Sequence, residues 1–188
     1  MTVTKSIKEE IAGFELPDNV KSKALQIFEL IKDQVGTCRS HIRKQLLYFL
    51  VHNAYLELGE PPIQSEIIRT VKVDDSSVSK ALKEFTWPRT RYRMKDDNST
   101  PEDLLPHYGR VLGIRKDAVD DLIQRCQVWT HHPTLKRMPV IVVTAGILKY
   151  YMDTHGLTID WPRITHLFNV SKVVIEGAYD VISNLDNN

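Results

Sequence analysis

Two basic residues stand directly before an apolar run in the second half of the sequence. Lys136 and Arg137 follow His131 and His132, and the apolar run begins just after Pro139. A helix that starts there would place free backbone N–H groups beside two cations, and both features attract phosphate. The pattern therefore indicates a phosphate contact, and an ordinary solvent-exposed loop is the alternative interpretation.

A second basic stretch lies between the two halves of the chain. Its four cations alternate with aromatic and apolar residues before the sequence turns acidic: Arg89, Arg91, Arg93 and Lys95 are interleaved with Trp87, Tyr92 and Met94. Such a stretch suits a clamp on a phosphate backbone or on the acidic surface of a partner protein. A soluble linker is the alternative interpretation.

No set of residues in the sequence has the spacing of an enzyme site. A glycine-rich phosphate loop, a Gly-x-Ser-x-Gly elbow and a His-Glu-x-x-His motif are all missing. The two cysteines, Cys38 and Cys126, form no zinc pattern, and Cys126 with His131 and His132 lacks a fourth ligand. We therefore expect neither catalysis nor a metal or other cofactor.

The composition is that of an ordinary globular protein. The 188 residues are 42% hydrophobic and 26% charged, with a formal net charge of +1. There is no global basic field, so any contact with nucleic acid must come from a local patch. No apolar run reaches the ~18 residues of a membrane span, and the N-terminus lacks a signal core. We expect an intracellular protein without a membrane contact.

The end of the chain, residues 158–183, has the pattern of a helix-turn-helix. Apolar residues recur at helical spacing on both sides of Asn169 and Val170, which form the predicted turn. Pro162 suits the first turn of the leading helix, and the Ser171 hydroxyl is expected to cap the second. The candidate DNA contacts on the second helix are Ser171, Lys172 and Val173, and a solvated helix face is the alternative.

Helical periodicity also predicts the elements that precede this motif, so the expected fold class is all-α. In the first half we expect helices over about residues 4–14, 18–35, 40–58 and 63–71, and a further one that ends near Phe85. The second half opens with Thr100 as N-cap and Pro101 at the first helical position, and continues with helices over about 115–129 and 140–152. The runs 46–54 and 140–152 are apolar nearly all round, as in a central bundle helix.

The two halves match at a fixed offset. Val73 and Val170 both precede the last helix of their half, and 170 − 73 = 97. Five more apolar pairs agree at this offset: Ile67/Ile164, Val71/Phe168, Val78/Ile175, Ala81/Ala178 and Phe85/Ile182. Arg39 and Arg137 are 137 − 39 = 98 apart. We interpret this as a duplicated five-helix unit, with repeats at 1–87 and 100–188 and a linker at 88–99. Coincidence between two amphipathic stretches is the alternative.

The duplication extends the set of candidate DNA contacts to the first repeat. The residues at positions equivalent to the second-half candidates are Arg39, Ser40, Lys72 and Lys80. Asp74 and Asp75 lie among them and would repel phosphate, which weakens this surface as a DNA contact.

Three stretches of the second half resemble the cyclin-like core of the general transcription factor IIB family. TPEDLLPHYGRVLGI is similar to the opening of the family repeat, LKRMPVIVVTAGILKYYM to the entry into its central helix, and ITHLFNVSKVVIEGAYDVI to its closing helix-turn-helix. The resemblance covers about residues 4–184. It implies two cyclin-like repeats in a monomer, and a phosphate contact at Arg137.

The same resemblance implies a function in transcription initiation. Members of this family bind promoter DNA together with the TATA-binding protein and help to recruit RNA polymerase, which places the protein in the nucleus or at a site of transcription, such as a viral factory. The chain departs from the family in two ways. It has no zinc-ribbon cysteines, and Glu176 stands where the family has a base-contacting arginine. A cyclin-like regulator of a partner protein and a scaffold without DNA binding are therefore the alternative functions.

Overall fold

The computed structural model describes residues 6–36, 38–86 and 89–186, and every secondary-structure element in these ranges is a helix. Trp87, which belongs to the predicted basic clamp, lies outside the described residues. The chain divides into two compact units, residues 1–97 and 98–188, and each is described here by itself. The predicted all-α fold class is confirmed.

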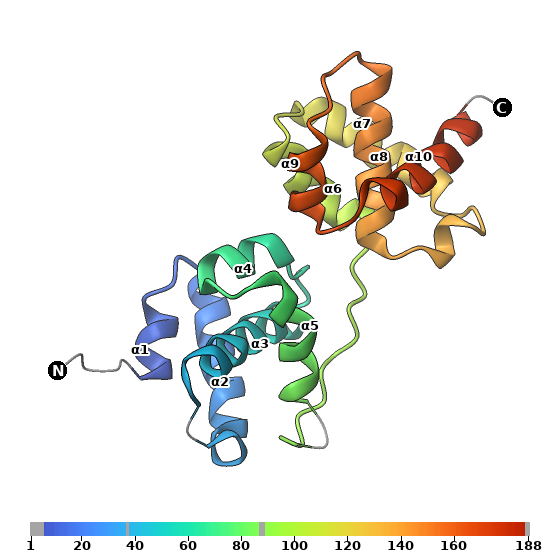
Figure 1. Ribbon diagram of the computed structural model, residues 1–188. Coiled ribbons are helices and arrows are strands. Elements are labelled where there is room, and N and C mark those ends of the chain that lie inside the picture. Colours follow the sequence, from blue (N-terminus) through green and yellow to red (C-terminus); the bar gives the residue numbers. More distant parts are fainter. Residues whose placement is uncertain (1–5, 37, 87–88, 187–188) are drawn as a thin grey trace. The chain divides into compact units, whose positions relative to one another are not determined.

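Within its described residues the first unit contains five helices: α1 (Ile7–Ala12), α2 (Asp18–Val35), α3 (Ser40–Leu58), α4 (Gln64–Val71) and α5 (Asp75–Glu84) (Figure 1). Helix α3 packs against α2, α4 and α5, and every residue from 45 to 54 is buried. A helix that is apolar all round has no face to give to water, so it occupies the centre of the bundle. Gly59 ends it in the left-handed conformation, with φ 73°.

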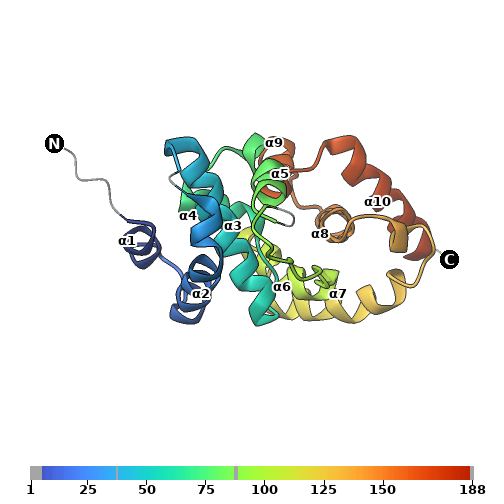
Figure 2. The ribbon, with the colours of Figure 1, turned by 90° about the horizontal axis from the view of Figure 1, so that it is seen from below.

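The second unit contains α6 (Pro101–Val111), α7 (Lys116–Trp129), a short 3-10 turn (Leu135–Arg137), α8 (Val140–Thr154), α9 (Trp161–Phe168) and α10 (Lys172–Asp186). Helix α8 is buried from residue 142 to 149 and packs against α6, α9 and α10. Figure 2 shows α8 end-on, with α6, α7, α9 and α10 around it. The predicted start of α6 is confirmed, because the Thr100 N–H donates to Asp103 Oδ2 at 2.8 Å and Pro101 is its first residue.

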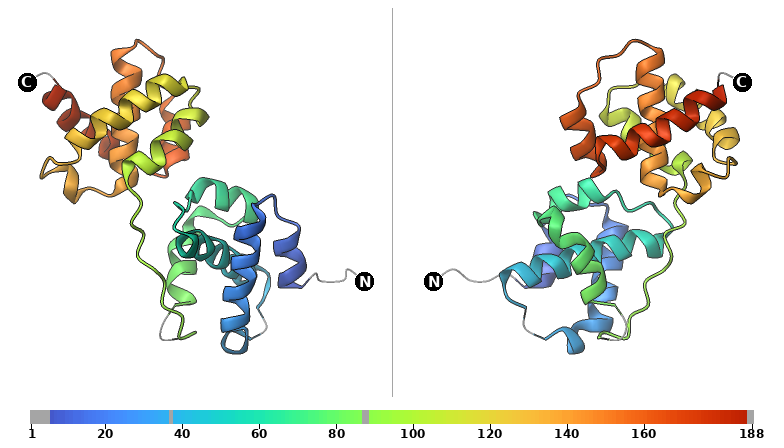
Figure 3. Two further views of the ribbon diagram at one scale, coloured as in Figure 1. Left: turned by 180° about the vertical axis from the view of Figure 1, so that it is seen from behind. Right: turned by 45° about the vertical axis from the view of Figure 1, so that its right-hand side comes forward.

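Helices α8 and α10 approach each other most closely at Gly146. A Cβ atom there would lie 2.7 Å from the Ala178 Cβ and 3.1 Å from the backbone nitrogen of Tyr179. Only a glycine allows this contact. The right-hand view of Figure 3 shows that α10 crosses α8. The buried face of α10 is formed by Ile175, Ala178 and Ile182.

The two units share the backbone of their closing parts. Helices α4 and α9 have eight residues each and start 161 − 64 = 97 positions apart, and α5 and α10 start 172 − 75 = 97 apart. The residue after α4 is Lys72 (φ 58°) and the residue after α9 is Asn169 (φ 51°), both left-handed. Gly59 and Gly156, also left-handed and 156 − 59 = 97 apart, follow the central helices.

The units differ in how their first helices pack. Helix α1 lies mainly on α2, whereas α6 packs against both α7 and α8. The starts of the central helices do not follow the offset of 97. Helix α3 begins at Ser40 and α8 at Val140, and 140 − 40 = 100. The offset of 97 therefore holds from the end of the central helix onward, whereas the helices before that point start 116 − 18 = 98 (α2 and α7) and 100 (α3 and α8) positions apart.

Residues 89–95, expected to be part of a linker, pack on the first unit. Thr90 is buried, and the Tyr92 ring meets the Phe49 ring edge-on with centroids 5.7 Å apart. The Tyr92 hydroxyl donates to Glu57 Oε1 at 3.2 Å, and Lys95 Nζ lies 3.0 Å from Glu57 Oε2. Burial, with the Glu57 carboxylate beside it, raises the pKa of Tyr92.

Candidate nucleic-acid interface

The second unit ends in a helix-turn-helix formed by α9 and α10. The Asp160 side chain accepts a hydrogen bond from the Arg163 N–H at 3.1 Å and so caps α9. Asn169 makes the turn in the left-handed conformation, which asparagine tolerates better than most residues. The predicted hydroxyl cap at Ser171 is not observed in the described residues. Its carbonyl oxygen instead accepts from the N–H groups of Val174 and Ile175.

The first turn of α10 is open to solvent. Ser171 and Lys172 are exposed, Val173 is 77% exposed, and Val174 is 46% exposed. Two valines are an unusual choice for a solvated helix face, because exposed apolar side chains gain nothing from water. Val174 is not among the predicted contacts, because helical periodicity places it with the buried apolar residues of the helix.

Lys172 has partners within its own unit. Its Nζ lies 3.5 Å from Glu176 Oε1, one helical turn away, and 4.9 Å from the centroid of the Trp161 ring. The ammonium group must leave both contacts before it can reach a phosphate. Glu176 therefore lowers the positive charge that this turn presents to solvent.

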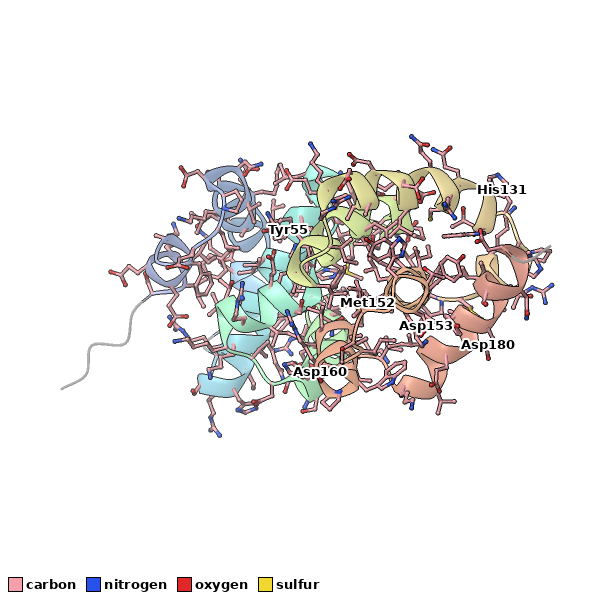
Figure 4. The ribbon with its side chains drawn as sticks, turned by 90° about the horizontal axis from the view of Figure 1, so that it is seen from above. Tyr55, His131, Met152, Asp153, Asp160 and Asp180 are labelled. Atoms are coloured by element: carbon pink, nitrogen blue, oxygen red, sulfur yellow. The ribbon has the colours of Figure 1, made fainter. Side chains whose placement is uncertain are left out.

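A buried lysine holds this motif against the centre of the bundle. Lys149 on α8 is 8% exposed, with its Nζ 3.7 Å from the Tyr179 ring centroid and 5.8 Å from that of Trp161. Its charge is balanced by Asp153 Oδ2 at 3.7 Å, which also accepts from the Tyr179 hydroxyl at 2.6 Å. That hydrogen bond raises the pKa of Tyr179. Figure 4 shows Asp153 on the side of α8 that faces α10.

Sequence reasoning overlooked Lys149, although a signal was present. It is the one charged residue in the otherwise apolar run from 140 to 152. An unpaired buried charge is costly, so a lysine in a buried apolar run indicates that a carboxylate or an aromatic ring lies beside its ammonium group.

Lys136 and Arg137 lie at the entry to α8. The buried side chain of Leu135 anchors the 3-10 turn, and Pro139 precedes the first residue of α8. Both basic side chains are exposed and form no ion pair within the described residues. Two free cations next to a helix N-terminus are suited to a phosphate. No hydrogen bond or ion pair of the described chain joins them to the first turn of α10.

The candidates of the first unit are exposed, and two of them, Lys72 and Lys80, lie on either side of two carboxylates in the sequence. Arg39 and Ser40 are at the start of α3, Lys72 is in the turn between α4 and α5, and Lys80 is on α5. Asp74 and Asp75 occupy the start of α5, the position that in the second unit is free of acidic residues.

The basic stretch before the second unit is partly engaged. Arg89 pairs with Glu84 and lies over the Phe85 ring, with 5.5 Å between the guanidinium carbon and the ring centroid. Lys95 pairs with Glu57, and Arg91 and Arg93 are exposed. Arg89 and Lys95 are therefore held on the surface of the first unit by carboxylates.

A metal site is not found among the described residues, where no group of three histidine, cysteine or acidic side chains is suitably placed. Burial, with Glu102 beside the thiol, raises the pKa of Cys126 to about 12, which keeps it protonated and a poor metal ligand. Within the described residues no helix is long and apolar enough to cross a membrane.

Comparison with protein-family models gives no match, and comparison with curated proteins gives none either.

Proposed function

We propose that this chain is the core of a transcription initiation factor of the general transcription factor IIB type, built from two cyclin-like repeats. It binds promoter DNA together with the TATA-binding protein and helps to recruit RNA polymerase. The observation that carries the proposal is the helix-turn-helix of the second unit, whose second helix presents an exposed first turn, Ser171 to Val174, from a firmly packed base.

The internal agreement of the two units supports the duplication on which this proposal rests. Two helix-turn-helix segments with equal α4 and α9 lengths and left-handed residues at the same offset of 97 fit two copies of one unit. The left-handed lysine and asparagine strengthen this point, because non-glycine residues adopt positive φ only rarely.

In this proposal the two basic features of the second unit have different tasks. Lys136 and Arg137 contact phosphates, which sets the position of the protein on DNA but does not read sequence. The first turn of α10 lies against the bases, where Ser171 offers a hydroxyl and Val173 an apolar surface. The near-neutral net charge makes binding to DNA alone weak, so the affinity depends on a protein partner already on the promoter.

Binding to a promoter fragment with and without the TATA-binding protein, measured over a range of salt concentrations, tests the proposal. We expect cooperative binding, with a salt dependence that corresponds to about two to four phosphates. Charge reversal at Lys136 and Arg137 should weaken the complex and lower that salt dependence, whereas reversal at exposed Lys116 on α7 serves as the matched control. Absence of any cooperative complex at low salt would overturn the proposal.

The second candidate is a cyclin-like regulator or scaffold that binds protein and not DNA. The specific observation in its favour is the first turn of α10, where Glu176 engages Lys172 and two valines face solvent. The same titration separates the two functions, because this candidate predicts binding to a protein partner that is unaffected by promoter DNA.

A further inference from the structure

An open cavity of about 650 Å³ lies within the first unit, between α1, α3 and the end of α4. We call it the α1–α3–α4 cavity. Its floor is apolar and consists of Phe14, Leu47 and Val71, of which the last two are almost fully buried in the core. This volume falls within the range of ligand-binding sites and accepts a few side chains.

The rim of the cavity is basic. Lys44 of α3, Arg69 of α4 and Lys72 of the following turn line it, and all three are exposed. The side chains of these three residues form no hydrogen bond and no ion pair within the described residues. Most other lining charges are already compensated, because Arg43 Nε lies 3.1 Å from Glu10 Oε1. With Glu15 as the remaining carboxylate, the free charge of the rim is positive.

The backbone at Lys72 adds an independent argument. Lys72 adopts φ 58° and ψ 46°, a left-handed conformation in which a Cβ-bearing residue is strained and glycine or asparagine is preferred. The equivalent turn of the second unit uses Asn169 at φ 51°. The first unit thus has Lys72 at a position where the backbone favours glycine or asparagine. The Lys72 side chain lies at the rim of the cavity.

We propose that the α1–α3–α4 cavity binds a short acidic segment of a partner protein. One apolar side chain of the segment rests on Phe14, Leu47 and Val71, and carboxylates beside it pair with Lys44, Arg69 and Lys72. Nucleic acid fits less well, because an apolar floor offers nothing to phosphate and the carboxylates of Glu10 and Glu15 line one side. The inference does not depend on DNA binding by the second unit.

A short fluorescein-labelled peptide in which leucine and phenylalanine alternate with pairs of aspartate is a suitable probe for fluorescence anisotropy with the full chain. We expect saturable binding that weakens as salt rises. Replacing each aspartate of the peptide by asparagine, or each leucine and phenylalanine by serine, should abolish binding. If either altered peptide binds as well as the original, the combined apolar and acidic recognition proposed here is wrong.

Variants of the rim locate the site. Lys44→Gln and Arg69→Gln should each weaken peptide binding by about five-fold, as expected for one partly exposed ion pair. Lys72→Asn should do the same while it raises the thermal midpoint, because asparagine suits the turn better. Lys83→Gln on α5 is the matched control, since Lys83 is exposed but outside the cavity, and it should bind like the parent protein.

Other results of these experiments would contradict the proposed peptide site. Equal peptide affinity in all four variants would overturn the proposal, as would the absence of peptide binding. If Arg69→Gln weakened binding to promoter DNA while the peptide failed to bind, the cavity would be a nucleic-acid contact instead. Loss of DNA binding by the second unit leaves the peptide result unaffected, so the two proposals fail independently.

Discussion

Gly146 of α8 lies directly beneath Ala178 of α10, so close that a Cβ atom on the glycine would be 2.7 Å from the alanine Cβ. Helix α10 carries the exposed turn of the candidate interface at its N-terminal end, and this contact lies about one turn further along the helix. The position of the interface relative to the core therefore depends on a residue without a side chain.

Gly146→Ala should destabilise the second unit by about 2 kcal/mol, because the new methyl group meets α10 and α8 cannot retreat from its other neighbours. Gly177→Ala is the matched control on α10, where the added Cβ has no atom within 4 Å. That change should stabilise the protein by about 0.5–1 kcal/mol through helix propensity. Urea unfolding of both variants measures the difference, and equal midpoints would contradict the close packing of the two helices.

His52 should make the first unit sensitive to mild acid. Burial lowers the pKa of this histidine to about 4, and only the charge of Asp97 acts in the opposite direction. In the unfolded chain the pKa of His52 is near 6.5. As the pH falls from about 6.5 to 4, His52 therefore takes up a proton in the unfolded chain but not in the folded one, which favours unfolding. The stability conferred by the buried neutral ring is thus present above pH 6.5 and is lost as the pH falls.

Between pH 7 and pH 5 this effect amounts to about 2 kcal/mol. Urea unfolding of the parent protein and of His52→Leu at both pH values checks the prediction, since the leucine variant retains the apolar packing and removes the titrating group. The pH dependence should be smaller in the variant by about the stated amount. An unchanged pH dependence would show that His52 is not responsible.

Glu176→Gln should strengthen binding of the second unit to promoter DNA several-fold at low salt. The change releases Lys172, whose Nζ lies 3.5 Å from the Glu176 carboxylate, and removes a charge that repels phosphate. Asp180→Asn is the matched control, because it removes one charge from the same helix at an exposed position one turn further on (Figure 4). Equal gains in both variants would indicate a general charge effect and not the release of Lys172.

Tyr92→Ala should destabilise the first unit by about 2–3 kcal/mol, because the ring packs edge-on against Phe49 and its hydroxyl donates to Glu57. Tyr92→Phe should lose only about 1 kcal/mol, which corresponds to the hydrogen bond. Met94→Ala, at an exposed position two residues later, should have little effect. Thermal unfolding distinguishes these cases, and a Tyr92→Ala variant as stable as the parent would mean that this segment is a free linker.

Much of the fold could be predicted because helix formation is local. The apolar runs of α3 and α8, the start of α6 at Thr100 and Pro101, and the end of α3 at Gly59 all depend on residues within a few positions of one another. The offset of 97 and the helix-turn-helix pattern were also visible, since they too are properties of sequence spacing.

The sequence by itself determined which segments are helical, which helices are central and where the basic residues stand along the chain. Only the tertiary structure decided which charges are already engaged and where free ones converge. Lys149 meets Tyr179 and Asp153 because α8 and α10 cross at Gly146, and Lys44 joins Arg69 and Lys72 because α3 and α4 pack side by side. Helical periodicity fixes the face on which a residue lies, whereas its partners depend on how side chains from distant elements fill a shared space.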